Sequence, residues 1–336
     1  MNNKKVLMDI SWSNKGGIGR FTDEISKLLC DISKEELYRK CASPLAPLGL
    51  AVNIFLRKKT DVVFLPGYIP PLFCSKKFII TIHDLNHLDL NDNSSLFKRL
   101  FYNFIIKRGC RKAYKIFTVS NFSKERIVAW SGVNPNKIVT VYNGVSSLFN
   151  ADVKPLNLGY KYLLCVGNRK THKNEKCVIS AFAKADIDPS IKLVFTGNPC
   201  NDLEKLIIQH GLSERVKFFG FVSEKDLPSL YKGSLGLVFP SLYEGFGLPV
   251  VEGMACGIPV LTSLTSSLPE VAGDAAILVD PLSEDAITKG ISRLINDSEL
   301  RKYLIQKGLL RAKRFNWQNV VSEIEMVLTE ACDGNK

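Results

Sequence analysis

The chain has 336 residues, of which 46% are hydrophobic and 23% charged, a composition typical of soluble globular proteins and a length that suits two domains. No apolar run reaches the roughly 18 residues that cross a bilayer, and the N-terminus lacks a signal-peptide pattern. The nine cysteines are dispersed and form no CxxC pair. They indicate reduced thiols in the cytosol, and neither a disulfide framework nor a zinc site. Residues 1–150 carry 23 Lys or Arg and 11 Asp or Glu, whereas residues 151–336 carry 22 of each, so the net charge of +12 lies in the first part.

This excess of positive charge predicts that the first part faces an anionic partner, such as a membrane surface, a phosphorylated acceptor or a nucleic acid. A basic surface that only aids solubility is the alternative. No recognised nucleic-acid-binding motif occurs in the chain, and we therefore expect no nucleic acid as partner.

The first half alternates short apolar runs with amphipathic stretches, which predicts a doubly wound parallel sheet. A glycine turn over 16–20 precedes a predicted helix over 21–32, and Ser120 is a candidate N-cap for a helix over 123–131. The strands predicted in this half are 6–10, 62–65, 78–82, 115–119 and 138–141.

The segment 98–115 is strongly basic and has aromatic and aliphatic residues interleaved with its cations. This pattern predicts an amphipathic helix that packs an apolar stripe on the sheet. Its basic face would lie toward an anionic bilayer surface.

A polar linker over 149–160 separates this half from a second one, in which the alternation restarts. The strands predicted there are 162–166, 192–196, 216–219, 235–240 and 258–261. The predicted helices are 175–184, 201–210, 248–256, 282–297, 298–311 and 317–331.

Glu244 and Glu252 stand eight positions apart, with a glycine-rich turn and the start of a helix between them. A glycine turn that leads into a helix offers backbone N–H groups and the positive end of the helix dipole to a phosphate. A carboxylate in the helix can accept hydrogen bonds from ribose hydroxyls. This arrangement predicts a nucleotide-linked substrate, a nucleotide sugar, although a plain turn and a solvated glutamate fit these residues as well.

Three other groups of candidate residues follow predicted strands. His83 ends one strand, where a neutral imidazole can bind a sugar hydroxyl, and His87 is a weaker candidate nearby. Arg169 and Lys173 lie in a cationic turn that can stabilise the charge on a departing diphosphate. The glycines over 16–19 let the backbone approach a ligand. The alternatives are a packed histidine, a solvated basic turn and a close-packed glycine turn.

These pieces, in this order, resemble the retaining glycosyltransferases of family 4, which have the GT-B fold. The resemblance spans nearly the whole chain. It rests on Gly16–Gly19, Thr81–Leu85, Val119–Ser123, Val141–Gly144, Val166–Lys173, Phe239–Pro249, Glu252 and Ala255–Pro259.

The resemblance implies roles for individual residues. Glu252 would bind the donor ribose, and Glu244 the donor sugar. Lys173, with Arg169, would neutralise the diphosphate, and His83 would touch the donor sugar near the reacting carbon. The remaining implied donor-side residues are Gly17, Gly19, Asn143, Phe246, Gly247 and Leu248. Many members carry Arg where Asn168 stands here, and Arg169 is displaced from that position by one residue.

The resemblance also implies two Rossmann-like α/β domains that face each other across a cleft. We expect an acceptor-side domain over 1–152, a nucleotide-sugar donor domain over 160–318, and a C-terminal helix over 319–332 that packs back toward the first domain. Family members of this type need neither a metal ion nor a cofactor, and a front-face mechanism is favoured in which the leaving diphosphate assists the acceptor hydroxyl.

The predicted protein is a cytoplasmic enzyme, peripheral on the inner face of the cytoplasmic membrane. It would transfer a sugar to a lipid-linked oligosaccharide in the synthesis of a bacterial O-antigen or capsule. GDP-mannose is the preferred donor, and dTDP-rhamnose or a UDP-sugar are the alternatives. A GT-B UDP-sugar epimerase and a non-catalytic sugar- or nucleotide-binding paralogue are the rival functions.

Overall fold

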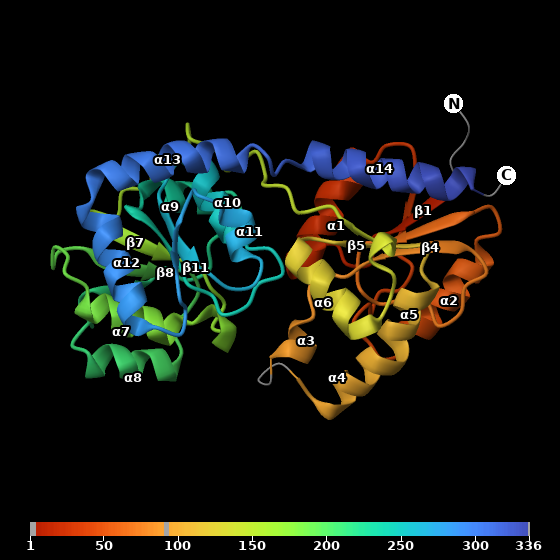
Figure 1. Ribbon diagram of the computed structural model, residues 1–336, viewed down its shortest axis with the longest axis horizontal. Helices are drawn as coiled ribbons and strands as arrows, with labels where there is room; N and C mark the ends of the chain where they lie inside the picture. Colours follow the sequence, from red (N-terminus) through yellow and green to blue (C-terminus); the bar gives the residue numbers. More distant parts are fainter. Residues whose placement is uncertain (1–4, 91–93, 335–336) are drawn as a thin grey trace. The chain divides into compact units, whose positions relative to one another are not determined.

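The computed structural model describes residues 5–90 and 94–334, which divide into two compact α/β units (Figure 1). Of the described residues, unit 1 comprises 5–90, 94–144 and 317–334, and unit 2 comprises 145–316. Each unit contains one six-stranded parallel sheet. The predicted fold class, two doubly wound α/β domains, is confirmed. The divisions follow Gly144 and Asn316, whereas the sequence placed them near residues 152 and 318.

Unit 1 has the strand order β2-β1-β3-β4-β5-β6. Its strands are β1 (Val6–Asp9), β2 (Ser33–Glu35), β3 (Val62–Leu65), β4 (Lys77–Thr81), β5 (Lys115–Thr118) and β6 (Ile138–Thr140). Its helices are α1 (Gly16–Leu28), α2 (Ala46–Leu56), α3 (Asn86–Asp89), α4 (Leu96–Phe101), α5 (Lys107–Lys112), α6 (Asn121–Ser131) and α14 (Trp317–Asp333). The predicted cap is confirmed, because the Ser120 hydroxyl accepts a hydrogen bond from the Ser123 N–H at 3.0 Å.

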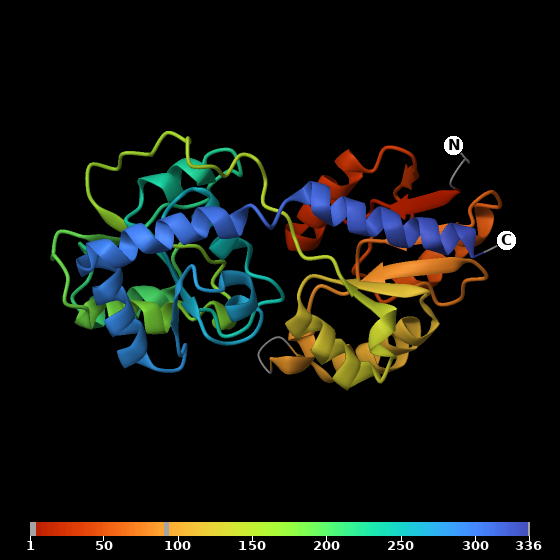
Figure 2. The ribbon, with the colours of Figure 1, turned by 45° about the horizontal axis from the view of Figure 1, so that its top comes forward.

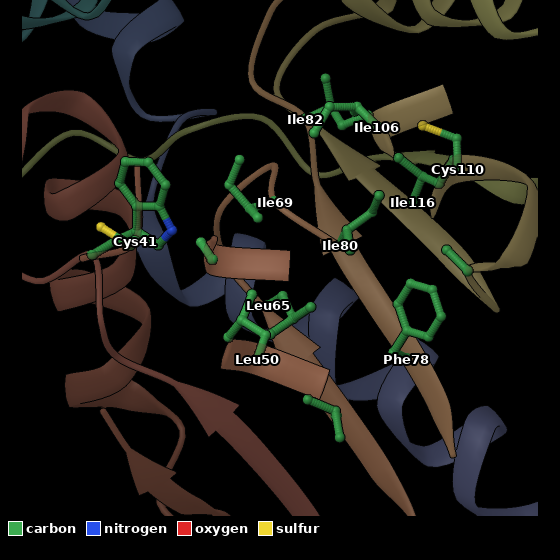
Figure 3. Close-up of a cluster of buried hydrophobic side chains, with 14 of the residues drawn as sticks. Cys41, Leu50, Leu65, Ile69, Phe78, Ile80, Ile82, Ile106, Cys110 and Ile116 are labelled. Atoms are coloured by element: carbon green, nitrogen blue, oxygen red, sulfur yellow. The ribbon is translucent and has the colours of Figure 1, made fainter. Parts of the chain in front are cut away.

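Both faces of this sheet are apolar, as expected for a parallel sheet covered by helices on each side. On one face Leu65, Ile80 and Ile116 join a buried cluster with residues of α2, α5 and α6, part of which is drawn in Figure 3. The other face is covered by α1 and α14, which contact each other, and α14 also contacts β3. Figure 2 shows α14 crossing in front of the strands of this unit.

Unit 2 has the strand order β12-β11-β10-β7-β8-β9. Its strands are β7 (Tyr162–Cys165), β8 (Lys192–Phe195), β9 (Val216–Phe218), β10 (Gly236–Phe239), β11 (Val260–Ser263) and β12 (Ile277–Val279). Its helices are α7 (Glu175–Lys184), α8 (Asn201–Gln209), α9 (Leu227–Gly233), α10 (Leu248–Ala255), α11 (Leu268–Ala272), α12 (Glu284–Asn296) and α13 (Ser298–Ala312).

Two local predictions were wrong in detail. Gly16–Arg20 is not a turn before the first helix, because α1 begins at Gly16 and ends at Leu28. The basic segment is not one regular helix, because a π-helical turn over Tyr102–Ile106 separates α4 from α5. Among the described residues, no helix is long and apolar enough to cross a membrane.

The strand order places one topological switch point in each sheet, where ligands of open α/β sheets bind beyond the carboxyl ends of the strands. In unit 1 the switch point lies between β1 and β3. In unit 2 it lies between β7 and β10. The loops that follow these four strands are therefore the expected positions of a ligand-binding site.

Candidate active site

In unit 2, the cationic turn after β7 and the glycine turn after β10 are hydrogen-bonded to each other. The carbonyl of His172 accepts hydrogen bonds from the Leu242 N–H and the Ser241 hydroxyl, both at 2.8 Å. The Asn174 side-chain amide donates to the carbonyl of Pro240 at 3.1 Å. The two turns singled out in the sequence thus form one structure at the switch point.

Lys173 and Glu244 form an ion pair between these turns, with Nζ and Oε1 2.7 Å apart. Their side chains are 15% and 13% exposed, and the Lys173 ammonium also lies over the ring of Phe239, 5.0 Å from its centre. Water screens such a half-enclosed pair poorly, so each charge holds the other in place. The pair holds a cation in a fixed position at the carboxyl ends of β7 and β10.

The glycine turn leads into α10, where Gly247 has a backbone φ of 108° and a Cβ atom would lie 2.6 Å from Leu268 Cδ2. Only glycine adopts this conformation without strain and fits the space. The Ser267 hydroxyl supports the turn, lying 2.9 Å from the Glu244 carbonyl and 2.8 Å from that of Phe246. The positive end of α10 therefore follows directly after Phe246 and Gly247, as a phosphate site requires.

Glu252 lies in α10 and is 3% exposed. Its Oε2 accepts a hydrogen bond from the Tyr231 hydroxyl at 2.8 Å, and Tyr231, in α9, is fully buried. The tyrosine holds the carboxylate in one orientation. Nothing in the sequence pointed to Tyr231, because the two residues belong to different helices and no motif joins them.

Arg169 is engaged inside unit 2. One guanidinium nitrogen lies 3.1 Å from Glu175 Oε1 and also donates a hydrogen bond to the Thr196 carbonyl, while the guanidinium stacks near the rings of Phe195 and Phe218. Burial raises the pKa of Glu175, and the Arg169 charge opposes this rise. From the sequence, Glu175 was predicted only to be the first residue of a helix. The role of Arg169 toward a diphosphate stays a prediction.

The other predicted residues belong to unit 1. His83 follows β4, and its Nε2 lies 2.9 Å from the Pro66 carbonyl. Since a carbonyl only accepts, Nε2 carries the proton and Nδ1 is left as an acceptor. Burial lowers the pKa of His83 to about 4, which keeps the ring neutral at physiological pH.

Helix α1, which carries these glycines, contacts this histidine through Phe21, whose ring packs edge-on against His83 with 4.9 Å between centroids. Gly17 has open space where a Cβ would stand, whereas a Cβ on Gly19 would lie 2.7 Å from the Trp12 carbonyl oxygen. Asn143 is 7% exposed, and its Oδ1 is buried without a hydrogen-bond partner in the described part of the chain.

The structure thus brings Lys173, Glu244 and the start of α10 together in unit 2, with Arg169 on the same loop as Lys173. His83, Gly17, Gly19 and Asn143 lie in unit 1. Over residues 5–90 and 94–334, no three His, Cys, Asp or Glu side chains are grouped as metal ligands.

Comparison with known proteins assigns the chain to a family. Residues 148–311 match the family model of the glycosyl transferases group 1, and residues 32–147 match that of Glycosyltransferase Family 4. The O-antigen chain mannosyltransferase B of Escherichia coli is 29% identical over 262 residues, which cover 74% of this chain and 69% of that protein.

A second relative is the MMP alpha-(1->4)-mannosyltransferase of Mycolicibacterium hassiacum, 31% identical over 242 residues that cover 69% of this chain and 58% of the relative. The crystal structure of a glycosyltransferase from Rickettsia africae superposes with a TM-score of 0.77 at 19% identity, covering 98% of this chain and 99% of that one. The chain belongs to glycosyltransferase family 4, has the GT-B fold and is a glycosyltransferase.

Proposed function

We propose that this glycosyltransferase moves a mannosyl group from GDP-mannose to a lipid-linked oligosaccharide during assembly of a bacterial surface polysaccharide. The ion pair of Lys173 and Glu244 at the switch point of unit 2 carries the proposal, because it sets a cation beside a helix start suited to a phosphate. The names of the two relatives support mannose and, for the first, an O-antigen chain. dTDP-rhamnose and UDP-sugars are the alternative donors.

In the proposed reaction, the bond between the sugar's anomeric carbon and the diphosphate oxygen breaks, and negative charge grows on the departing diphosphate. Lys173 donates to these oxygens and the positive end of α10 faces them, so that charge is stabilised most in the transition state. The acceptor hydroxyl bonds to the anomeric carbon on the same face, and its proton passes to the diphosphate. We propose that these groups act without a metal ion or other cofactor.

The remaining site residues bind the donor in this proposal. Glu252, held by Tyr231, accepts hydrogen bonds from the ribose hydroxyls. Glu244 and the backbone of Phe246, Gly247 and Leu248 contact the sugar and phosphates, and the Nδ1 of neutral His83 accepts from a sugar hydroxyl. We propose that Arg169 helps Lys173 to neutralise the diphosphate and that Gly17, Gly19 and Asn143 contact the donor.

We also propose that the enzyme is cytoplasmic and docks on the inner membrane face through unit 1. Large apolar side chains are exposed within the basic segment, at Phe104 (68%), and directly before it, at Leu96 (77%) and Phe97 (61%). Exposed apolar side chains flanked by lysines and arginines are typical of helices that lie in an anionic membrane interface.

The test of the donor is thermal unfolding with GDP, UDP, dTDP or ADP, each at millimolar concentration. A nucleotide at 100 times its dissociation constant adds about 2.7 kcal/mol of stability, and we expect the clear shift with GDP. Glu252→Ala should weaken that binding by about 1–3 kcal/mol, the scale of a hydrogen bond to a charged group, and Tyr231→Phe by less. A GDP affinity unchanged in Glu252→Ala would rule out the ribose role.

A further inference from the structure

Helix α2 has large apolar side chains on both its buried and its exposed side. Ala46, Leu50 and Ile54 are buried in the cluster that covers one face of the unit 1 sheet. A helix that is apolar on opposite sides is normally covered on both. The apolar side chains exposed on the helix and at its N-cap, which we call the α2 face, are Leu45 (64%), Leu48 (45%), Val52 (45%), Phe55 (69%) and Leu56 (63%).

The α2 face is one stripe along the helix. Its members follow one another at intervals of three, four, three and one residues, which places them within about 100° of arc at 3.6 residues per turn. Apolar surface that is contiguous in this way marks a contact with a membrane or another protein.

The length of α2 limits how it could meet a membrane. Its 11 residues measure about 16 Å at about 1.5 Å per residue, whereas the apolar core of a bilayer is about 30 Å thick. The helix is therefore too short to span a bilayer and could only lie along its surface.

Cations stand at both ends of the α2 face. The exposed cations of residues 39–40 precede the helix, and those of residues 58–59 follow it. A further cation, Arg57, is paired with Glu35 at 2.9 Å. From residue 37 to residue 60 the chain has five cations and no carboxylate. An anionic bilayer suits this pattern, because apolar side chains enter the acyl boundary while cations meet the lipid phosphates.

The same charges argue against a second copy of the chain as the occupant of the α2 face. A symmetric dimer would set the two faces against each other. Since both ends of the face are basic, either direction of packing would bring like charges together, which disfavours the contact. The charges therefore favour a bilayer.

The α2 face adjoins the basic segment 98–115. Side chains of α2 and of this segment belong to the buried cluster that Figure 3 draws in part, so both cover the same face of the sheet. Leu72 joins them, because its N–H donates to the Pro47 carbonyl at 2.8 Å and its carbonyl accepts from Arg108 Nη1 at 2.6 Å. Phe73, the next residue, is 47% exposed. Helix α2 thus continues the surface through which we propose that unit 1 meets the membrane.

We propose that α2 is an interfacial helix that inserts into the membrane. It lies in the plane of an anionic bilayer, with the α2 face in the acyl boundary and the flanking cations at the phospholipid headgroups. The inference rests on the membrane docking of the proposed function, which it deepens by naming the element that enters the lipid. The basic segment supplies attraction to the charged surface, and α2 supplies the apolar contact.

The first test is cosedimentation of the full chain with vesicles of phosphatidylcholine, alone or mixed with phosphatidylglycerol in equal parts. We expect binding to the mixed vesicles that weakens as salt is added. Phe55→Ser should weaken it about 10-fold or more, the scale for returning one large apolar side chain to water. The matched control is Ile208→Ser, which removes a side chain of α8 in unit 2 that is 70% exposed. The control should bind as the wild type does.

The second test measures insertion by fluorescence. Phe55→Trp places a tryptophan on the α2 face, and brominated acyl chains quench a tryptophan that lies among them. We expect quenching beyond that of the wild-type protein, whose own tryptophans are Trp12, Trp130 and Trp317. Ile208→Trp should add no quenching.

Three outcomes would each overturn the proposal. They are vesicle binding of wild-type strength in Phe55→Ser, no added quenching in Phe55→Trp, and a dimer in solution that Phe55→Ser converts to a monomer, which would assign the α2 face to a second copy.

The same experiments separate this inference from the proposed function. Vesicle binding that is unchanged in Phe55→Ser but lost in the double variant Arg111→Gln, Lys112→Gln would remove α2 and keep the docking through the basic segment. A chain that binds no vesicles but shows the GDP shift would remove both membrane proposals and leave the glycosyl transfer. Vesicle binding that depends on Phe55, without any GDP shift, would keep α2 and remove the donor assignment.

Discussion

Lys173 and Glu244 are 71 positions apart in the chain, yet their charged atoms lie 2.7 Å apart between two turns that are hydrogen-bonded to each other. Arg169, only four residues before Lys173, turns instead to Glu175 and two phenylalanine rings. At the scale of single residues, neighbours on one cationic turn therefore have different surroundings. This predicts different effects when they are removed.

Removal of the Lys173 side chain should slow the chemical step more than it weakens donor binding. We expect Lys173→Ala to lower kcat by about 10²–10³-fold, the usual loss for one donor to a developing anion, with a much smaller change in nucleotide affinity. Steady-state kinetics and GDP titration measure the two effects. Lys170→Ala, an exposed lysine of the same turn, is the control, and wild-type kcat in the Lys173 variant would contradict the assignment.

The pKa of His83 predicts a pH dependence of stability. The folded protein keeps this ring neutral down to about pH 4, whereas an unfolded chain takes up the proton near pH 6.5. Between these values the unfolded state binds more protons, so stability falls as the pH is lowered.

From pH 7 to pH 5 this group should cost about 2 kcal/mol of unfolding free energy. Denaturant unfolding at both pH values checks this. In His83→Asn the fall should be smaller by that amount, and an identical fall in both proteins would show that His83 is not the titrating group.

At the scale of elements, the start of α10 is the position with the strictest requirement for one residue type, glycine. Gly247 has a left-handed backbone, a Cβ at this position would meet the Leu268 side chain, and the residue joins the turn that carries Glu244 to the helix that carries Glu252. The π-helical turn over Tyr102–Ile106 is a second local feature of this kind. It separates α4 from α5, whereas the sequence pattern predicts one continuous helix.

Gly247→Ala should destabilise unit 2 by about 1–3 kcal/mol from backbone strain alone, with a further loss because the Cβ meets Leu268. Gly211→Ala is the matched control in the same unit, because Gly211 also has a positive φ (66°) but open space around a Cβ. Urea unfolding and GDP affinity are the measurements. We expect the larger loss of stability, and a loss of nucleotide affinity, only at Gly247.

At the scale of the whole molecule, unit 1 is built from two separate stretches of chain. α14 follows unit 2 in sequence but buries Trp317, Ile324 and Leu328 within unit 1, where Trp317 packs on Phe21 with 6.0 Å between ring centroids. Unit 2, in contrast, is one continuous segment with its own core. The two units should therefore respond separately to loss of this contact.

Trp317→Ala should cost unit 1 about 3–5 kcal/mol, the usual range for truncating a buried tryptophan, and leave unit 2 and its GDP shift unchanged. Hydrogen exchange, followed separately for peptides of residues 5–90 and 145–316, measures this. Met326→Ala, a site on α14 that is 66% exposed, is the control. Equal loss of protection in both units would contradict the division.

Much of the local structure follows from the sequence, because strand and helix periodicities are local properties. The buried strand at Tyr162–Cys165 and the helix at Glu175–Lys184 lie within one residue of where the pattern predicts them. The family motifs, in their order, led to the correct fold class and to a glycosyltransferase. Strand β2 was missed because Ser33–Glu35 is short, polar and at the edge of the sheet.

By itself, then, the sequence determined the alternation of strands and helices, the two-domain α/β class and the loops that carry the candidate residues. Only the tertiary structure decided which partners those residues have: Lys173 with Glu244, Glu252 with Tyr231, and Arg169 with Glu175. It also decided that α14 completes unit 1. The reason is that the periodicity of a segment reflects which of its residues are buried in its own helix or strand. The pairing of side chains from distant segments depends on how the elements pack together, which no local pattern encodes.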